Sequence, residues 1–216
     1  MTYGILGGTF DPLHRGHLDV AEAARAALGL DRVVFVPARV PSHRGTPQAS
    51  AAHRFAMTAL AVQPYGHLLV SDIEMHDDTP SYTAVTLGRL ASLGLDPART
   101  FFLTGADAFL DIRTWHNYPA VLDLSHFAVV SRPGHPATRM PEWLPDLAAR
   151  MRRVPCAVPR EPSILLVDAP TAAVSSTDVR RLAASGGAIG DLVPPAVADY
   201  ILKHDLYSGH KAQGFA

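Results

Sequence analysis

The first tenth of the chain combines residues that could bind phosphate. Residues 4–20 read GILGGTFDPLHRGHLDV, with Gly7 and Gly8 directly after an apolar run and with His14 and His17 three positions apart. Adjacent glycines let a ligand approach the backbone closely, because no Cβ stands in the way. If a helix begins just before the second histidine, both imidazoles and the N–H groups of the helix N-terminus can face one anion.

Taken alone, the residues of this stretch also fit purely structural roles. Two glycines after a strand can form a tight strand-to-helix turn, and a histidine pair can pack, cap a helix or supply half of a metal site. The dinucleotide motif G-x-G-x-x-G and the Walker lysine motif are both absent, and no third and fourth metal ligand follows at characteristic spacing. The adjoining Thr9, Phe10, Asp11 and Pro12 favour a functional loop.

The elements that must position these residues alternate along the chain. Short apolar runs predict strands at residues 3–6, 32–36, 68–73, 100–103, 127–130 and 164–167. Helix-period stretches predict helices at residues 17–28, 51–62, 82–93, 143–151, 176–184 and 196–204. Continuous apolar runs suit strands that are buried on both faces. The alternation therefore predicts an α/β fold, with a doubly wound, mostly parallel sheet and flanking helices.

In a sheet of this kind, ligands bind beyond the carboxyl ends of the strands. The loops after five of the predicted strands carry glycine, hydroxyl, histidine or arginine side chains. They read GGTFDPLHRGH, PARVPSHRGTP, TGADAF, SRPGH and DAPTAAVSSTDVR. One polar pocket would collect all of them. A Pro-rich stretch at 132–162 interrupts the alternation and could be a small subdomain or an edge addition.

Composition limits the class of protein. The chain of 216 residues fits one domain, expected over 1–207 with a small helical part at 176–207 and a tail at 208–216. A net charge of −1 provides no basic field for nucleic acid. The single Cys156 excludes an internal disulfide, and no run of about 18 apolar residues predicts a membrane span. We expect a cytoplasmic protein, and the sequence leaves a homo-oligomer open.

Two segments resemble the signatures of the nucleotidyltransferase superfamily. These are GGTFDPLHRGH at 7–17 and VSSTDVR at 174–180, in the superfamily's order. Within it, the chain resembles the bacterial nicotinate-nucleotide adenylyltransferases from Tyr3 to about Tyr207. The narrower likeness rests on PSHR at 41–44, SYTAVTL at 81–87, GADAFLDIRTWHNYPAVL at 105–122 and LVPPAVADYILKHDLY at 192–207. Arg44 stands where the family commonly has lysine.

The resemblance implies attack by the 5′-phosphate of nicotinate mononucleotide on the α-phosphorus of ATP, which gives deamido-NAD and pyrophosphate. That nucleophile is already an anion, so the enzyme needs no general base and works by alignment and charge neutralisation. His14, His17 and Arg180 are then the catalytic residues. Mg²⁺ is expected with ATP, held mainly by phosphates and water, and no protein metal ligand is assigned.

The resemblance also implies two sets of binding residues. The ATP set comprises Gly7, Gly8, Thr9, Phe10, Gly105, Asp107, Arg132, Ser176 and Thr177. The nicotinate mononucleotide set comprises His43, Arg44, Tyr82, Thr83, Trp115 and Tyr118. Simpler roles stay open for several of them: helix capping for Asp107, Ser176 and Thr177, surface exposure for Arg132, and core packing for Trp115.

Two other functions fit the same motifs. One is a different transferase of the superfamily, such as a pantetheine-phosphate adenylyltransferase, although that family generally carries Thr at the position of His14. The other is a nucleotide-binding module without catalysis, because a fold alone does not determine function. The presence of both histidines, Arg180 and Trp115 favours the adenylyltransferase.

Overall fold

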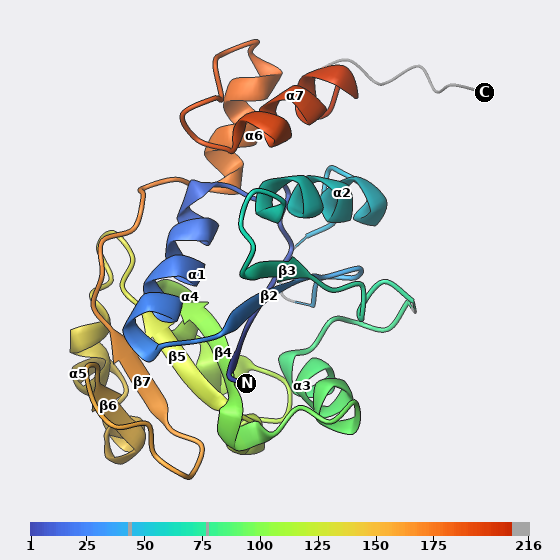
Figure 1. Ribbon diagram of the computed structural model, residues 1–216. Helices are drawn as coiled ribbons and strands as arrows, with labels where there is room; N and C mark the ends of the chain where they lie inside the picture. The colour runs from blue at the N-terminus through green and yellow to red at the C-terminus, as the bar shows by residue number, and fades with distance from the viewer. Residues whose placement is uncertain (43–44, 77, 209–216) are drawn as a thin grey trace.

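The computed structural model describes residues 1–42, 45–76 and 78–208 (Figure 1). Its strands are β1 (Tyr3–Gly8), β2 (Arg32–Pro37), β3 (Leu68–Val70), β4 (Thr100–Gly105), β5 (His126–Val130), β6 (Met151–Arg153) and β7 (Ile164–Val167). Its α-helices are α1 (Arg15–Leu28), α2 (Ala51–Val62), α3 (Thr83–Ser92), α4 (Ala106–Phe109), α5 (Met140–Trp143), α6 (Ser176–Ala184) and α7 (Pro195–Lys203). The predicted α/β class is confirmed.

All seven strands form one sheet in the order β3-β2-β1-β4-β5-β7-β6, and every neighbouring pair is parallel. The chain moves outward from β1 to β3 on one side and returns to the other side at β4. The switch point therefore lies between β1 and β4, where the loops that leave the two strands diverge. In open parallel sheets this is the place where ligands bind.

The sheet is covered on both faces, which explains the continuous apolar runs of its strands. Along β4, Phe101 and Leu103 belong to one core cluster, whereas Phe102 belongs to the other. Along β1, Leu6 and Ile5 divide in the same way. Successive side chains point to opposite faces of a strand, so each position must be apolar when both faces are buried.

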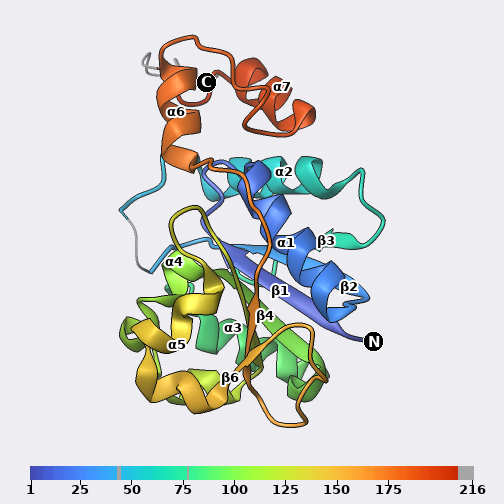
Figure 2. The same cartoon turned by 90° about the vertical axis from the view of Figure 1, so that its left-hand side faces the viewer.

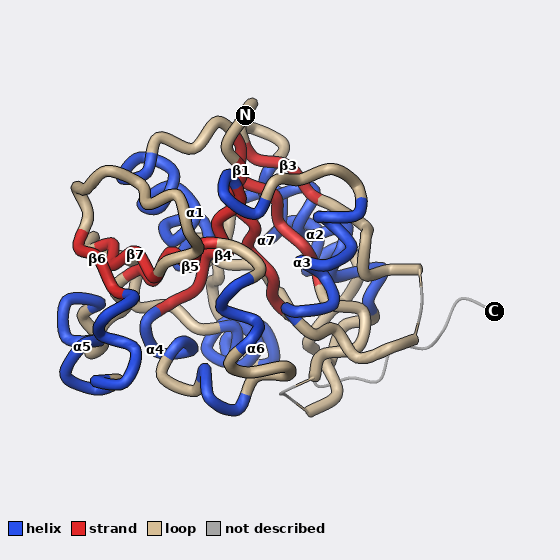
Figure 3. Tube along the Cα trace, turned by 90° about the horizontal axis from the view of Figure 1, so that it is seen from below, coloured by secondary structure: helices blue, strands red, loops and turns tan. Residues whose placement is uncertain are grey.

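The cluster that contains Leu103 also takes buried residues from α1, α2, α6 and α7. The cluster that contains Phe102 takes them from α3, α4 and α5. Viewed along the sheet, α1 lies on one side of the strands and α4 and α5 lie on the other (Figure 3). Helices α6 and α7 stand next to α2 at the end of the molecule toward which β1 points (Figure 2). They occupy the segment predicted as the C-terminal helical part.

The prediction of a helix over residues 143–151 is wrong. The α-helix α5 ends at Trp143, a 3₁₀ helix covers Pro145–Arg150, and strand β6, which the sequence did not predict, follows directly. Leu144 leaves the helical region with φ −130° and ψ 64°, just before a proline that restricts it. Strand β6 lies at the edge of the sheet and buries only Met151 of its three residues, so it has no apolar run.

The other helices begin and end within about two residues of their predicted bounds. The predicted strand 68–73 is shorter in the structure, because pairing with β2 ends at Val70. The expected tail, 208–216, lies outside the described residues apart from Ser208. Within 1–42, 45–76 and 78–208, none of the helices combines the length and the apolar character needed to span a bilayer.

Candidate active site

The loop after β1 has a shape that requires its second glycine. A Cβ atom built on Gly8 would lie 2.8 Å from the ring of Phe10, which is closer than Cβ contacts in proteins allow. Phe10 has a φ of 47° and is 2% exposed, so its side chain packs beneath the loop. The loop therefore turns tightly over its own aromatic ring, and Gly7, Gly8 and Thr9 remain partly exposed.

His14 and His17 lie together at the start of α1, as the sequence predicted. His14 is the N-cap residue of the helix and is 4% exposed. The two rings stack with their centroids 3.7 Å apart and an interplanar angle of 27°. Such contact places both imidazoles beside the N–H groups of the first helical turn, where the helix dipole favours an anion.

One hydrogen bond determines how His17 presents its proton. The backbone N–H of His14 donates to Nδ1 of His17 at 3.2 Å. A backbone N–H can only donate, so this Nδ1 must be the acceptor and the proton of a neutral ring resides on Nε2. The Nε2 atom of His17 is thereby held as a donor.

The first turn of α6 packs against the loop after β1. Ser176 Oγ donates to the carbonyl of Pro12 at 3.0 Å, and Arg180 Nη1 donates to the carbonyl of Asp11 at 2.7 Å. Arg180 Nη2 also donates to Thr177 Oγ1 at 3.3 Å. The structure thus brings the two predicted signature segments into direct contact, although more than 160 residues separate their bonded partners in the chain.

The capping role that stayed open for Ser176 and Thr177 belongs to their neighbour. Ser175 is the N-cap of α6, and its hydroxyl accepts the Asp178 N–H at 3.1 Å. Ser176 is half-buried and Thr177 is exposed. The hydroxyls of these two residues are therefore not needed to start the helix.

Asp11 orders the surroundings of this junction. Its carboxylate is 5% exposed and accepts the N–H groups of Gln48 at 2.8 Å and of Ala49 at 3.1 Å. The hydroxyl of Tyr207, near the end of the described chain, donates to the same carboxylate at 2.8 Å. Arg180 completes the group with an ion-pair distance of 3.8 Å. Burial raises the pKa of Tyr207, so this phenol stays protonated and acts as a donor.

The end of β4 and the loop after β5 meet at Gly105. A Cβ atom on Gly105 would lie 2.4 Å from Asp107 Oδ1 and 3.0 Å from Arg132 Cγ, so a side chain there would displace both of them. Gly105 is itself the N-cap of α4, which removes the capping role considered for Asp107. Asp107 is exposed in the first turn of that helix.

Arg132 is not a simple surface arginine. Its guanidinium donates to the carbonyls of Gly16 at 3.3 Å, of Ala172 at 3.4 Å and of Val174 at 3.2 Å, and its side chain is half-buried. These contacts join the loop after β5 to the start of α1 and to the segment that leads into α6. Arg132 therefore fixes the relative positions of three elements of the site.

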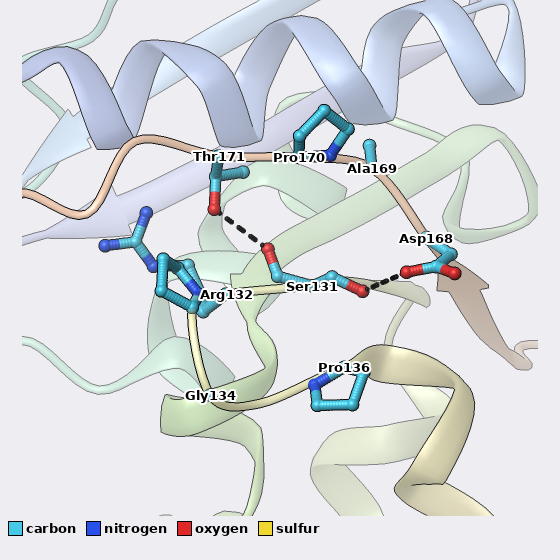
Figure 4. Close-up of a pocket in the computed structure, with 9 residues that line it drawn as sticks. Ser131, Arg132, Gly134, Pro136, Asp168, Ala169, Pro170 and Thr171 are labelled. Carbon is cyan, nitrogen blue, oxygen red and sulfur yellow. Dashed lines mark hydrogen bonds between the residues drawn. The ribbon is translucent and has the colours of Figure 1, made fainter.

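A cavity of about 300 Å³ lies beside Arg132, between residues 131–136 and 168–171. The two segments face each other across it (Figure 4), and two hydrogen bonds join them. Ser131 Oγ donates to Asp168 at 2.7 Å, and Thr171 Oγ1 donates to the carbonyl of Ser131 at 3.1 Å. The sequence singled out neither Ser131 nor Asp168, because each gains its partner only when β5 and β7 pair.

On the other side of the switch point, the start of α3 faces the segment after α4. The rings of Tyr82, the N-cap of α3, and His116 stack with centroids 4.3 Å apart. Trp115 is half-buried, and its ring lies at 84° to that of Phe102 with the two centroids 5.9 Å apart. Trp115 thus touches the core while part of it stays exposed. The sequence prediction missed His116, although it adjoins Trp115.

Two other residues predicted to bind nicotinate mononucleotide adjoin Tyr82 and the Trp115 segment. Thr83 is the first residue of α3 and is half-buried, and Tyr118 packs against the same core cluster as Trp115. His43 and Arg44 lie outside the described residues. In the part of the chain that the structure describes, no three or more His, Cys, Asp or Glu side chains are grouped so that they could hold a metal ion.

The parallel sheet, the histidine pair at the N-terminus of α1 and the adjoining first turn of α6 define a Rossmann-like nucleotidyltransferase. A family model described as cytidylyltransferase-like matches residues 5–182. A relative from Roseiflexus sp. is 42% identical over 205 residues, which cover 94% of this chain and 96% of the relative. A relative from Symbiobacterium thermophilum is 40% identical over 214 residues, which cover 97% of each chain.

Both relatives are named as probable nicotinate-nucleotide adenylyltransferases. The chain therefore belongs to the cytidylyltransferase-like family and, within it, to the nicotinate-nucleotide adenylyltransferases. A solved structure, the nicotinic acid mononucleotide adenylyltransferase of Plasmodium falciparum complexed with APC, has the same fold with a TM-score of 0.70 at 19% identity. The match covers 95% of this chain and 96% of that one.

Proposed function

We propose that the protein transfers the adenylyl group of ATP to nicotinate mononucleotide and thereby forms deamido-NAD and pyrophosphate in NAD biosynthesis. The observation that carries this proposal is the contact between the histidine loop and α6, in which Arg180 donates to the Asp11 carbonyl at 2.7 Å. It surrounds the end of β1 with His14, His17 and one guanidinium. The names of the relatives support the choice of acceptor.

The chemistry needed from the chain is alignment and charge stabilisation. The phosphate of the acceptor is the nucleophile, so no side chain has to abstract a proton in this scheme. The Nε2–H of His17 and the Arg180 guanidinium would donate to phosphate oxygens as negative charge moves to the departing pyrophosphate. Removing one such donor typically lowers kcat by about 10²- to 10³-fold.

The ATP site in this proposal comprises the bare backbone of the β1 loop, the end of β4 and the first turn of α6. Gly7, Gly8, Thr9, Phe10, Gly105, Asp107, Arg132, Ser176 and Thr177 form this set. A side chain at Gly8 would clash with the ring of Phe10, and one at Gly105 would displace Asp107 and Arg132. Arg132 and Ser176 bond backbone carbonyls, so their contribution is to hold the walls of the site in place.

The acceptor site would lie at the start of α3. Helix α3 has Tyr82 as its N-cap, and the side chain of Tyr82 makes no capping hydrogen bond. The N–H groups at a helix N-terminus favour a carboxylate, and Trp115 offers an aromatic ring for stacking nearby. This supports nicotinate over nicotinamide, because an amide would bring further donors to a donor-lined site. Thr83, Tyr118, His43 and Arg44 complete the set.

Mg²⁺ would enter with ATP, coordinated by phosphate oxygens and water, and would neutralise phosphate charge. That mode of binding fits a site whose proposed donors to phosphate are cationic or backbone groups. We also propose a single catalytic domain over 1–207, because Tyr207 bonds Asp11 in the first loop. A cytoplasmic location fits an enzyme that consumes ATP.

The experiment that tests this function is a pyrophosphate-release assay with the purified protein, ATP and Mg²⁺. Nicotinate mononucleotide, nicotinamide mononucleotide and phosphopantetheine are compared as acceptors, and products are identified by mass spectrometry. The proposal expects the highest kcat/KM with nicotinate mononucleotide and a product with the mass of deamido-NAD. A preference for phosphopantetheine would assign the chain to another transfer reaction, and binding of ATP without any turnover would indicate a non-catalytic module.

A further inference from the structure

A buried arginine outside the proposed catalytic set joins the loops that leave β1 and β2. Arg54 lies in α2 and is 1% exposed. Its Nη1 donates to the carbonyls of Thr9 at 2.7 Å and of Ala38 at 2.6 Å. Its Nη2 donates to the carbonyl of Arg39 at 3.1 Å, and its Nε donates to the carbonyl of Ala49 at 3.2 Å. One side chain thus holds three separate backbone segments.

The shape of the guanidinium is needed for this arrangement. The four bonds use four of the five N–H groups that an arginine carries, and they leave in different directions within one plane. A lysine would offer donors from a single nitrogen and could not reach all four carbonyls. Burial lowers the pKa of Arg54, and the charge of Asp11 acts against that shift. The charge is therefore retained in the interior by carbonyl dipoles and by one carboxylate.

The bond to Thr9 also determines the direction of a backbone N–H. The C=O and N–H groups of a trans peptide point in opposite directions within one plane. Because the Thr9 carbonyl points inward to Arg54, the Phe10 N–H points away from the guanidinium. The same reasoning turns the N–H that follows Ala38 away from Arg54. Both loops therefore have their donors oriented by one buried side chain.

We propose that Arg54 is a positioning residue for adenylyl transfer, which holds the Thr9–Phe10 peptide and the backbone of residues 38–39 in the geometry that receives the two substrates. This inference rests on the proposed function, because it assigns the loop after β1 to ATP. The Ala38 N–H also donates to the carbonyl of Gly8 at 2.9 Å, so the two loops are in direct contact beside Arg54. A shift of either loop would move the other.

The test compares Arg54→Lys with a matched variant, Arg150→Lys. Arg150 Nη2 likewise donates to two backbone carbonyls, those of Leu122 at 2.8 Å and of Pro162 at 3.2 Å, but it belongs to the segment before β6. Steady-state kcat and KM for both substrates, circular dichroism and thermal unfolding are measured for each protein. Displacing reacting groups by about 1 Å can cost on the order of 10²-fold, so we expect Arg54→Lys to lower kcat by about 10- to 100-fold. Arg150→Lys should lower only thermal stability.

Three results would overturn the proposal. The first is a folded Arg54→Lys protein with wild-type kcat and KM. The second is an equal loss of kcat in Arg150→Lys, which would make the effect one of general stability. The third applies when Arg54→Lys does not fold: Arg54→Gln is then measured, and a failure of both to fold would reduce Arg54 to a stability role.

Failure of the proposed function would be seen separately, as a wild-type protein that binds ATP but forms no product with nicotinate mononucleotide. In that case, the Kd of ATP is measured for the wild type and for Arg54→Lys. Positioning of the Thr9–Phe10 peptide predicts weaker binding of ATP by Arg54→Lys, and equal Kd values would overturn it.

Discussion

The two ring nitrogens of His17 have different roles: Nδ1 holds the start of α1, and Nε2 is proposed to donate to phosphate. Its Nδ1 accepts the His14 N–H at 3.2 Å, which leaves Nε2 as the donor. Asparagine can place its side-chain oxygen near the position of Nδ1 but has no group that reaches the position of Nε2. His17→Asn therefore keeps the contact at the helix start and removes the proposed contact with phosphate, whereas His17→Ala removes both.

The expected magnitudes follow from these two contacts. A net intramolecular hydrogen bond contributes about 0.5–1.5 kcal/mol to the free energy of unfolding, so His17→Ala should be less stable by roughly that amount. His17→Asn should lose less stability than His17→Ala, because both lack the ring that stacks on His14 but asparagine keeps an acceptor for the His14 N–H. Loss of a donor to the developing charge corresponds to about 2.7–4 kcal/mol, so kcat should fall by about 10²- to 10³-fold in both variants.

Pyrophosphate release at saturating ATP and nicotinate mononucleotide measures kcat, and urea unfolding measures stability. The combination of a stable protein and a large loss of kcat in His17→Asn is the diagnostic result. A His17→Asn protein whose kcat stays within a few-fold of the wild type would refute the assignment of Nε2. A loss of stability in His17→Asn as large as in His17→Ala would refute the assignment of Nδ1.

Other contacts give three further predictions. Tyr207→Phe removes the donor to the buried Asp11 carboxylate and should lower the free energy of unfolding by about 1.5–3 kcal/mol in urea titrations. His126 is fully buried and burial lowers its pKa, so the unfolded chain binds more protons below about pH 6.5. Stability should therefore decrease as pH falls below this value, by at most about 1.4 kcal/mol per pH unit from this group. His126→Asn, which can still accept the Ser163 N–H, should show a flatter pH profile in urea unfolding. Trp115→Phe should raise KM for nicotinate mononucleotide more than KM for ATP, and an equal rise in both would argue against acceptor stacking.

The sequence predicted the layers of the fold because a central strand that is buried on both faces needs a continuous run of apolar residues. The sequence did not predict strand β6, because this strand lies at the edge of the sheet and buries only Met151. The predicted helix at 143–151 failed at Leu144, where a following proline makes the helical conformation unfavourable. Both failures lie in the Pro-rich stretch that interrupted the alternation of strands and helices.

The candidate site was predictable where its residues are close in sequence. Stacking of His14 on His17 follows from their spacing at a helix start. Contact between α6 and the first loop required two signatures that resemble those of one superfamily. Arg54 could not be identified in this way, because a single arginine in a helix ordinarily points to solvent. Its partners are backbone carbonyls, which every residue carries and which leave no signal in the sequence.

The central claim is that the acceptor phosphate attacks the α-phosphorus of ATP directly while the chain supplies only positioning and charge. The stereochemical course of the reaction tests this claim most directly. The substrate is a single diastereomer of ATP in which sulfur replaces one non-bridging oxygen of the α-phosphate, and nicotinate mononucleotide is the acceptor. Direct transfer predicts inversion of configuration in the deamido-NAD product, as read by ³¹P NMR. Retention would indicate two displacements through an adenylylated side chain such as His14 or His17, and would contradict the account.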